Sequence, residues 1–203
     1  MHTKPYFEGQ VENMGRLDEL KQHLTPGKVY RRADLTRWTT SVDRDLRKLL
    51  DAGELTKLSG GVYLRPKTTA FGRAPANDRD LVEAFLKDKR FLMLTPNVYN
   101  ALGVGATQLY NETVVYNRKR HGRFKLGNRV YDLRMKPEFP AVATKEFLTV
   151  DLVNNLKRLT EDETQVLERI RTEARKLDQD ALRQAAEDYG GVRAKKFFRD
   201  VLL

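Results

Sequence analysis

Residues 28–65 constrain the fold more than any other part of the chain, because short strand and helix patterns follow one another there in a specific order. Val29-Tyr30 is typical of a short apolar strand, and Ala33–Arg37 predicts a compact helix that ends near Trp38. A second helix pattern follows. Two short strands come next, separated by the small residues Ser59-Gly60-Gly61. This order of elements indicates a winged helix-turn-helix.

The second helix pattern has clear start and stop signals. Thr40-Ser41-Val42-Asp43 offers a Ser/Thr N-cap followed by an acidic residue, which predicts a capping box, and Gly53 provides the C-terminal stop. The apolar residues recur at helical spacing and predict a buried stripe: Val42, Leu46, Leu49 and Leu50. The other side carries polar and basic residues: Ser41, Arg44, Arg47 and Lys48.

The net charge of +10 is distributed unevenly. Residues 16–67 hold twelve Lys/Arg against seven Asp/Glu, and residues 118–136 hold eight against one. Residues 160–203 hold nine against ten and are close to neutral. Exposed Lys and Arg also keep ordinary proteins soluble. Segregation into two basic segments nevertheless favours a polyanionic partner such as nucleic acid.

The composition excludes several classes of protein. The chain has 203 residues, enough for two modest domains, and no cysteine, which excludes disulfides, thiolate zinc sites and cysteine nucleophiles. No run of about 18 apolar residues predicts a membrane span. Residues 1–10 lack the apolar core of a secretory signal. We therefore expect no membrane association and a cytoplasmic location.

The pattern predicts an α+β chain with a winged helix-turn-helix domain at residues 1–68, a connector at 69–77, and a mixed α+β domain with C-terminal helices at 78–203. Asp78 is expected to cap a helix that runs through Lys87. Strands are predicted at 113–116, 122–126 and 129–135, and helices from Thr144 onward. In the strands, the predicted inward residues are Phe124, Leu126, Val130 and either Tyr131 or Leu133, and the predicted outward ones are Arg123, Lys125, Arg129 and Arg134. The last helix is expected to bury Val192, Phe197, Phe198, Val201 and Leu202.

The sequence contains no pattern typical of a catalytic site. It has no phosphate-binding P-loop, and Gly103-Val104-Gly105 does not follow a predicted strand. His2, His23 and His121 are scattered and lack the spacing of a zinc site or a triad. We expect no enzymatic activity, no cofactor and no metal ion.

The chain resembles the AbiEi-type antitoxins, the transcription-regulator halves of bacterial abortive-infection toxin–antitoxin systems. In that family a helix-turn-helix with a "glycine, any, tyrosine" wing precedes a domain with an "asparagine, any, leucine-glycine" segment. The matching elements here are Arg44–Leu50, Gly61–Tyr63 and Asn100–Gly103. The likeness covers most of residues 10–160, and the order and spacing of the motifs carry it.

The resemblance implies an autoregulating bacterial repressor that binds inverted repeats in the double-stranded DNA of its own promoter. The C-terminal domain would counteract a cognate nucleotidyltransferase-like toxin, with or without direct contact, in defence against phage. No cofactor is implied.

Within this interpretation, the predicted DNA contacts fall into three groups. The helix and its N-terminus would supply Thr39, Thr40, Ser41, Arg44, Arg47 and Lys48, with base contacts from the helix and phosphate contacts from the two threonines. The wing would supply Lys57, Ser59, Gly60, Gly61 and Arg65. Arg31 and Arg32 are further phosphate candidates.

Three questions stay open at the level of sequence. The basic stretch Arg118, Lys119, Arg120, Arg123 and Lys125 would extend the DNA footprint or face an acidic partner or a tRNA-like surface. The chain would also fit a winged-helix regulator without a toxin partner. A third alternative is a winged-helix module that binds proteins.

Overall fold

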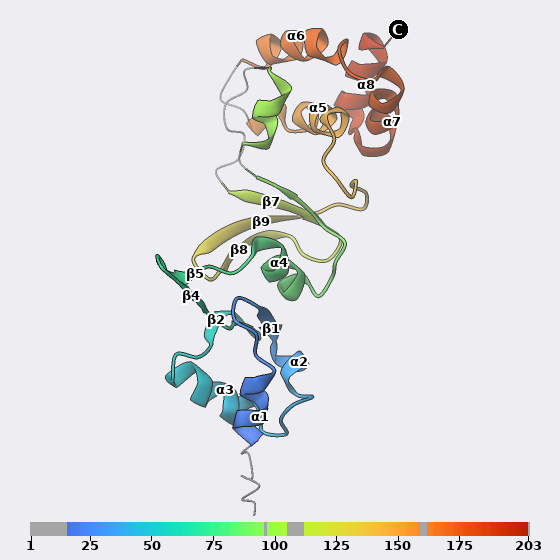
Figure 1. Ribbon diagram of the computed structural model, residues 1–203. Coiled ribbons are helices and arrows are strands. Elements are labelled where there is room, and N and C mark those ends of the chain that lie inside the picture. Colours follow the sequence, from blue (N-terminus) through green and yellow to red (C-terminus); the bar gives the residue numbers. More distant parts are fainter. Residues whose placement is uncertain (1–15, 96, 105–111, 159–161, 203) are drawn as a thin grey trace, which may run out of the picture. The chain divides into compact units, whose positions relative to one another are not determined.

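The computed structural model describes residues 16–95, 97–104, 112–158 and 162–202 (Figure 1). Helices and strands both occur throughout, which confirms the α+β class. The chain divides into two compact units, Met1–Phe85 and Leu86–Leu203. The segment 1–10, in which no signal sequence is expected, and Gly105 lie outside the described residues.

The first unit begins with helices packed on a small sheet. Its elements in order are α1 (Arg16–Gln22), β1 (Val29–Arg31), α2 (Arg32–Leu35), α3 (Val42–Asp51), β2 (Thr56–Ser59) and β3 (Val62–Leu64). The strands pair antiparallel in the order β1-β3-β2. One apolar core joins them, formed by Leu20, Leu24, Tyr30, Leu35, Val42, Leu46, Leu49, Leu55 and Tyr63.

The segment after β3 contains regular structure where we expected an irregular connector. Strands β4 (Lys67–Thr69) and β5 (Gly72–Ala74) form an antiparallel hairpin. Helix α4 (Asp78–Leu86) follows where the sequence predicts it. Its start differs by one residue, because the Asn77 side chain accepts hydrogen bonds from the backbone N–H groups of Arg79 and Asp80.

The second unit contains a sheet whose order does not follow the chain. Strands β6 (Leu92–Leu94), β7 (Thr113–Asn117), β8 (Gly122–Leu126) and β9 (Arg129–Met135) are arranged β6-β7-β9-β8. β7 and β9 run parallel, and the other neighbours are antiparallel. The register of β9 buries Tyr131 and Leu133. Two predictions are wrong: Val130 lies on the opposite face and is exposed, and Arg134, on that same face, is buried beside Asp132.

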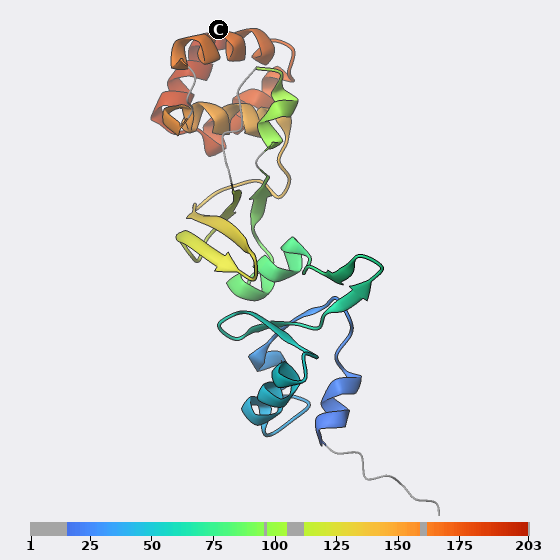
Figure 2. The same ribbon diagram turned by 90° about the vertical axis from the view of Figure 1, so that its left-hand side faces the viewer.

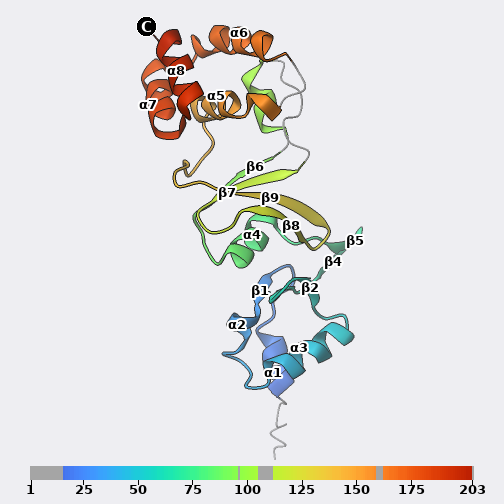
Figure 3. The same cartoon turned by 180° about the vertical axis from the view of Figure 1, so that it is seen from behind.

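Helices complete the second unit (Figure 3). They are the 3-10 helix η1 (Val98–Leu102), α5 (Lys145–Asn154), η2 (Leu156–Arg158), α6 (Glu163–Ala174), α7 (Gln179–Tyr189) and α8 (Val192–Val201). The predicted cap at Thr144 is confirmed, because its hydroxyl accepts a hydrogen bond from Phe147 N. Residues of α5 to α8 and of the sheet share one core. Val192, predicted to be buried, is 91% exposed at the first position of α8.

A tight corner joins α7 to α8 and is held by α5. The Asn154 side chain donates to Tyr189 O and accepts from Gly191 N, at 3.0 and 2.8 Å. At Gly190, a Cβ atom would lie 2.3 Å from the backbone oxygen of Ala186, closer than real Cβ atoms approach such an atom. The corner therefore requires glycine for space, although the backbone of Gly190 is in the ordinary extended region.

Candidate nucleic-acid interface

Helix α3 separates apolar and basic residues onto two faces. Val42, Leu46 and Leu49 are buried in the core of the first unit, as predicted. Arg44, Arg47 and Lys48 lie on the exposed face. No ion pair joins Arg47 or Lys48 to an acidic residue in the parts of the chain that the structure describes. The helix thus presents a basic face held in place by its buried side.

The start of α3 is built differently from the predicted capping box. Ser41 is the N-cap residue, but its side chain makes no capping hydrogen bond. Thr39 instead accepts a bond from Ser41 N and donates its hydroxyl to the carboxylate of Asp45, and both side chains are buried. The Thr39 hydroxyl is therefore engaged inside the protein, and its predicted contact with phosphate stays a prediction. Thr40 is exposed.

Arg32 connects the start of α3 with the β2–β3 turn. Its guanidinium makes two hydrogen bonds to the Asp43 carboxylate, at 2.7 and 2.6 Å, and its backbone N–H donates to Gly61 O. This hydrogen bonding with Arg32 lowers the pKa of Asp43 and raises the pKa of Arg32. Both side chains face solvent, so the pair contributes little to stability. The pair with Asp43 and the backbone bond to Gly61 hold the Arg32 guanidinium beside the β2–β3 turn.

The β2–β3 hairpin presents a short, narrow turn. Gly61 has a φ of +71°, a left-handed backbone conformation that favours glycine, and Gly60 is surrounded by open space. The strand register shifts between Lys57 and Ser59, which marks a bulge next to the turn. Lys57 is exposed and Ser59 half-buried. The small turn residues and Lys57 are therefore accessible together.

Two other arginines predicted at the interface are occupied within the first unit. Arg31 makes two hydrogen bonds to Asp34, and this pairing lowers the pKa of the Asp34 carboxyl. Arg65 donates to the backbone and the carboxylate of Glu54, both at 2.9 Å. Its backbone pairs with residues 27 and 28, so it lies at the open end of the β2–β3 hairpin. Arg65 therefore lies away from the turn, although the sequence assigned it to the contacts of the wing.

Sequence reasoning missed Arg37, an exposed cation between α2 and α3. Its guanidinium lies 5.4 Å from the centre of the Trp38 ring, which also stacks on His23. The neighbouring Trp38 in the sequence could have indicated Arg37, because an aromatic ring attracts a guanidinium group and holds it in place.

The basic stretch of the second unit is largely paired with acidic residues. Arg118 contacts Glu138 at 2.7 Å, Lys119 contacts Asp88 at 3.4 Å, and Arg123 is hydrogen-bonded to Glu112. Arg120 lies in a turn organised by the Asn117 side chain, which accepts from the backbone N–H groups of residues 119 and 120. Lys125 is exposed on β8. Acidic partners from outside the stretch therefore weaken its positive field.

A buried carboxylate lies elsewhere in the second unit. Asp151 of α5 is 1% exposed and accepts hydrogen bonds from the hydroxyls of Tyr99 and Tyr116. The ammonium of Lys136 lies 3.1 Å from the carboxylate and 3.9 Å from the centre of the Tyr116 ring. Because every donor points at one buried charge, the cluster ties α5 to η1 and β7. No sequence pattern pointed to Asp151.

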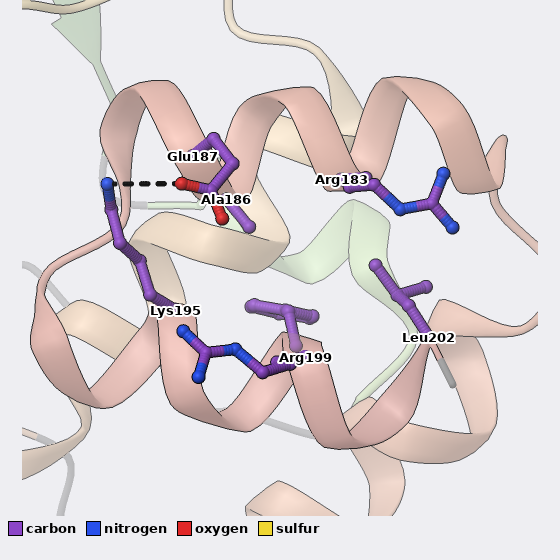
Figure 4. A pocket seen from close by; sticks show the side chains of 7 residues that line it. Arg183, Ala186, Glu187, Lys195, Arg199 and Leu202 are labelled. Carbon is purple, nitrogen blue, oxygen red and sulfur yellow. Dashed lines mark hydrogen bonds and ion pairs between the residues drawn. The ribbon is translucent and has the colours of Figure 1, made fainter.

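A shallow pocket of about 160 Å³ lies between α7 and α8 (Figure 4). Arg183, Lys195 and Arg199 line it, but Lys195 pairs with Glu187 and the guanidinium groups of Arg183 and Arg199 point in different directions. Among the described residues, no group of three or more His, Asp or Glu side chains could hold a metal ion. The helices in the same residues are too short or too polar to cross a membrane.

Comparison of the chain with protein-family models, with curated proteins and with solved structures found no match.

Proposed function

We propose that the first unit is a winged helix-turn-helix that binds duplex DNA, with α3 in the major groove and the β2–β3 hairpin as its wing. The observation that carries the proposal is the basic face of α3, where Arg44, Arg47 and Lys48 are exposed opposite the buried Val42, Leu46 and Leu49. A helix fits the major groove, and arginine pairs bidentately with guanine there.

The contacts that support this proposal differ from those expected from sequence. Lys57, Gly60, Gly61 and Arg32 are accessible around the turn and suit the phosphate backbone. Thr39, Arg31 and Arg65 instead bond to acidic side chains of the first unit. Phosphate would compete with Asp43 for Arg32, since both are anions that accept from the same guanidinium.

The test measures binding of the full chain to a fluorescent duplex that carries the DNA upstream of its own gene. The double variant Arg44→Ala/Arg47→Ala is expected to lose about 100-fold in affinity, since each bidentate arginine contributes roughly 1–3 kcal/mol. The matched control, Lys196→Ala/Arg199→Ala, removes the same charge from α8 of the second unit. Equal binding by both double variants would remove α3 from the interface.

We further propose that the protein is the antitoxin of a bacterial toxin–antitoxin pair of the AbiEi type. The support is the resemblance, whose motifs fall on α3, on the β2–β3 turn and on η1. Tyr99, adjacent to the Asn100–Gly103 motif, anchors the buried Asp151 cluster. In this proposal the first unit represses the operon and the second counteracts a cytoplasmic nucleotidyltransferase-like toxin.

Co-expression with the nucleotidyltransferase encoded beside this gene tests the antitoxin proposal. The full chain carrying Arg44→Ala/Arg47→Ala is expected to restore growth as well as the unaltered chain does, while losing DNA binding. If the unaltered chain does not restore growth, the antitoxin proposal fails and the DNA-binding proposal stands on its own assay. Loss of rescue in the double variant alone would show that α3 serves both tasks.

A further inference from the structure

The hairpin of β4 and β5 has almost no core of its own. Every residue from Lys67 to Arg73 is exposed, and the hairpin projects from the helices and sheet of the first unit (Figure 2). A hairpin of two strands is only marginally stable in water unless something packs on it. The structure therefore presents an arm whose side chains are available to a partner.

The tip of this arm holds an aromatic side chain in the open. Phe71 is fully exposed. The turn around it is closed by Thr69, whose hydroxyl donates to Gly72 O at 2.8 Å and accepts from Phe71 N at 3.3 Å. The ring is thus displayed on an ordered turn, which lowers the entropy lost when it binds.

The charge around the tip selects an anionic partner. Residues 65–77 contain Arg65, Lys67 and Arg73 and no acidic residue. Lys67 and Arg73 occupy opposite strands, and Thr68 pairs with Arg73 across the hairpin. A single phenylalanine between two cations offers too little apolar area for a protein interface, which typically buries hundreds of square ångströms.

The arm also connects with the basic face already described. Arg73 Nη2 lies 3.3 Å from the position that a Cβ would occupy on Gly53, directly after α3. The Arg73 side chain of the arm therefore reaches the C-terminal end of the proposed recognition helix, within the same compact unit. A duplex bound by α3 would extend past this end.

We propose that the β4–β5 arm is a second DNA-contacting element, and that Phe71 enters the minor groove and wedges between two stacked base pairs. Lys67 and Arg73 contact the flanking phosphates. Apolar side chains inserted in this way unstack a base step and bend the duplex. This inference rests on the proposed DNA-binding function and adds bending to it.

The test uses the full chain and the upstream duplex, prepared with 2-aminopurine at successive positions and with a fluorophore pair at its ends. Unaltered protein is expected to raise 2-aminopurine fluorescence at one step and to shorten the end-to-end distance. Phe71→Ala should lose both signals and bind about ten-fold more weakly, because base–aromatic stacking is lost. Phe71→Leu should retain part of each signal.

Val192→Ala is the matched control, because Val192 is also an exposed apolar residue but belongs to the second unit. Unchanged thermal unfolding of Phe71→Ala shows that the variant is folded. Full affinity and full signals in Phe71→Ala would overturn the wedge and leave the DNA-binding proposal intact. So would tight binding of unaltered protein without any 2-aminopurine signal. Failure of unaltered protein to bind the duplex overturns both proposals.

Discussion

The basic face of α3 in the first unit and the basic stretch of the second unit differ in how their cations are paired. In the first unit, Arg47 and Lys48 are exposed on α3 without an ion pair among the described residues. In the second unit, Arg118 and Arg123 are paired with Glu138 and Glu112, and Asp151 is buried among three donors. By sequence alone the second basic segment is the more positive of the two.

The difference shows why a count of charges along the chain overestimates some surfaces. Glu112, Glu138 and Asp88 lie outside the window 118–136, yet the fold brings each of them to a cation within it. The field that a partner meets depends on neighbours in space, because nearby opposite charges cancel at a distance. Four experiments can break or sharpen this contrast.

The largest expected effect is on the buried charge of the second unit. Asp151→Asn should lower the free energy of unfolding by about 3 kcal/mol, because Lys136 and two tyrosine hydroxyls lose their shared anion. Chemical denaturation at pH 7 measures it. Asp180→Asn is the control: its ion pair with Arg183 is on the surface, and its loss should change stability by less than about 0.5 kcal/mol. Similar losses of unfolding free energy in both variants would contradict a special role for the buried Asp151.

The next effect concerns the salt dependence of DNA binding. Removing Lys57, which is proposed to contact the phosphate backbone, should reduce the slope of log affinity against log salt by about 1, since each phosphate contact contributes about 0.9. Arg118→Ala/Arg123→Ala should leave the slope nearly unchanged, because those cations are already neutralised. Anisotropy titrations at several salt concentrations give the slope. An equal reduction in both variants would place the second basic stretch in the DNA footprint.

The third effect is a pH-dependent loss of stability in the first unit. Hydrogen bonding to Lys21, and then to Arg65, lowers the pKa of Glu54 below its usual 4.5. Glu54 therefore stabilises the fold at pH values above 4.5, and this contribution disappears as the pH falls through the lowered pKa. Glu54→Gln should cost about 1 kcal/mol at pH 7 and much less near pH 3. Thermal unfolding across this range measures it; a constant difference would show that the charge is not involved.

The smallest effect should be a gain. Asp43→Asn removes an exposed negative charge and releases Arg32 from its ion pair beside the turn. DNA affinity is then expected to rise roughly three-fold at low salt, within the range of an exposed ion pair, and to lose this advantage at high salt. Asp51→Asn, on the same helix, is the control for the change of charge alone. A decrease in affinity would mean that Asp43 positions Arg32 for binding.

Local patterns predicted much of the fold. The stripe of α3, the β2–β3 hairpin, strands β7 to β9 and the cap at Thr144 depend on residues within a few positions of one another. The order β6-β7-β9-β8 could not be predicted in this way, because β8 lies between β7 and β9 in sequence while these two pair in parallel. That pairing also decides which face of β9 is buried, and so accounts for the exposure of Val130. Arg134 lies on the same face as Val130 but is buried, where its guanidinium pairs with Asp132 and contacts Asn155.

The candidate surface was predictable to a similar degree. Arg44, Arg47 and Lys48 follow from helical periodicity alone. The bonds of Thr39, Arg31 and Arg65 to Asp45, Asp34 and Glu54 could not be predicted, because spacing does not show which charged and polar side chains will pair. The β4–β5 arm was missed because Pro66 and the small residues around Phe71 are typical of irregular loops as well as of turns.

The corner at Gly190 limits how this protein can vary. Any other residue there would place its Cβ against the carbonyl oxygen of Ala186, so α7 would have to lose its last turn before α8 could begin. In a saturation mutagenesis library, Gly190 should therefore tolerate no other residue, whereas the exposed Val192 two positions later should accept most. Sensitivity to substitution at Gly190 would reflect the steric requirement of the corner and not binding. A search for binding residues that used mutational sensitivity alone would therefore count Gly190 as a binding residue.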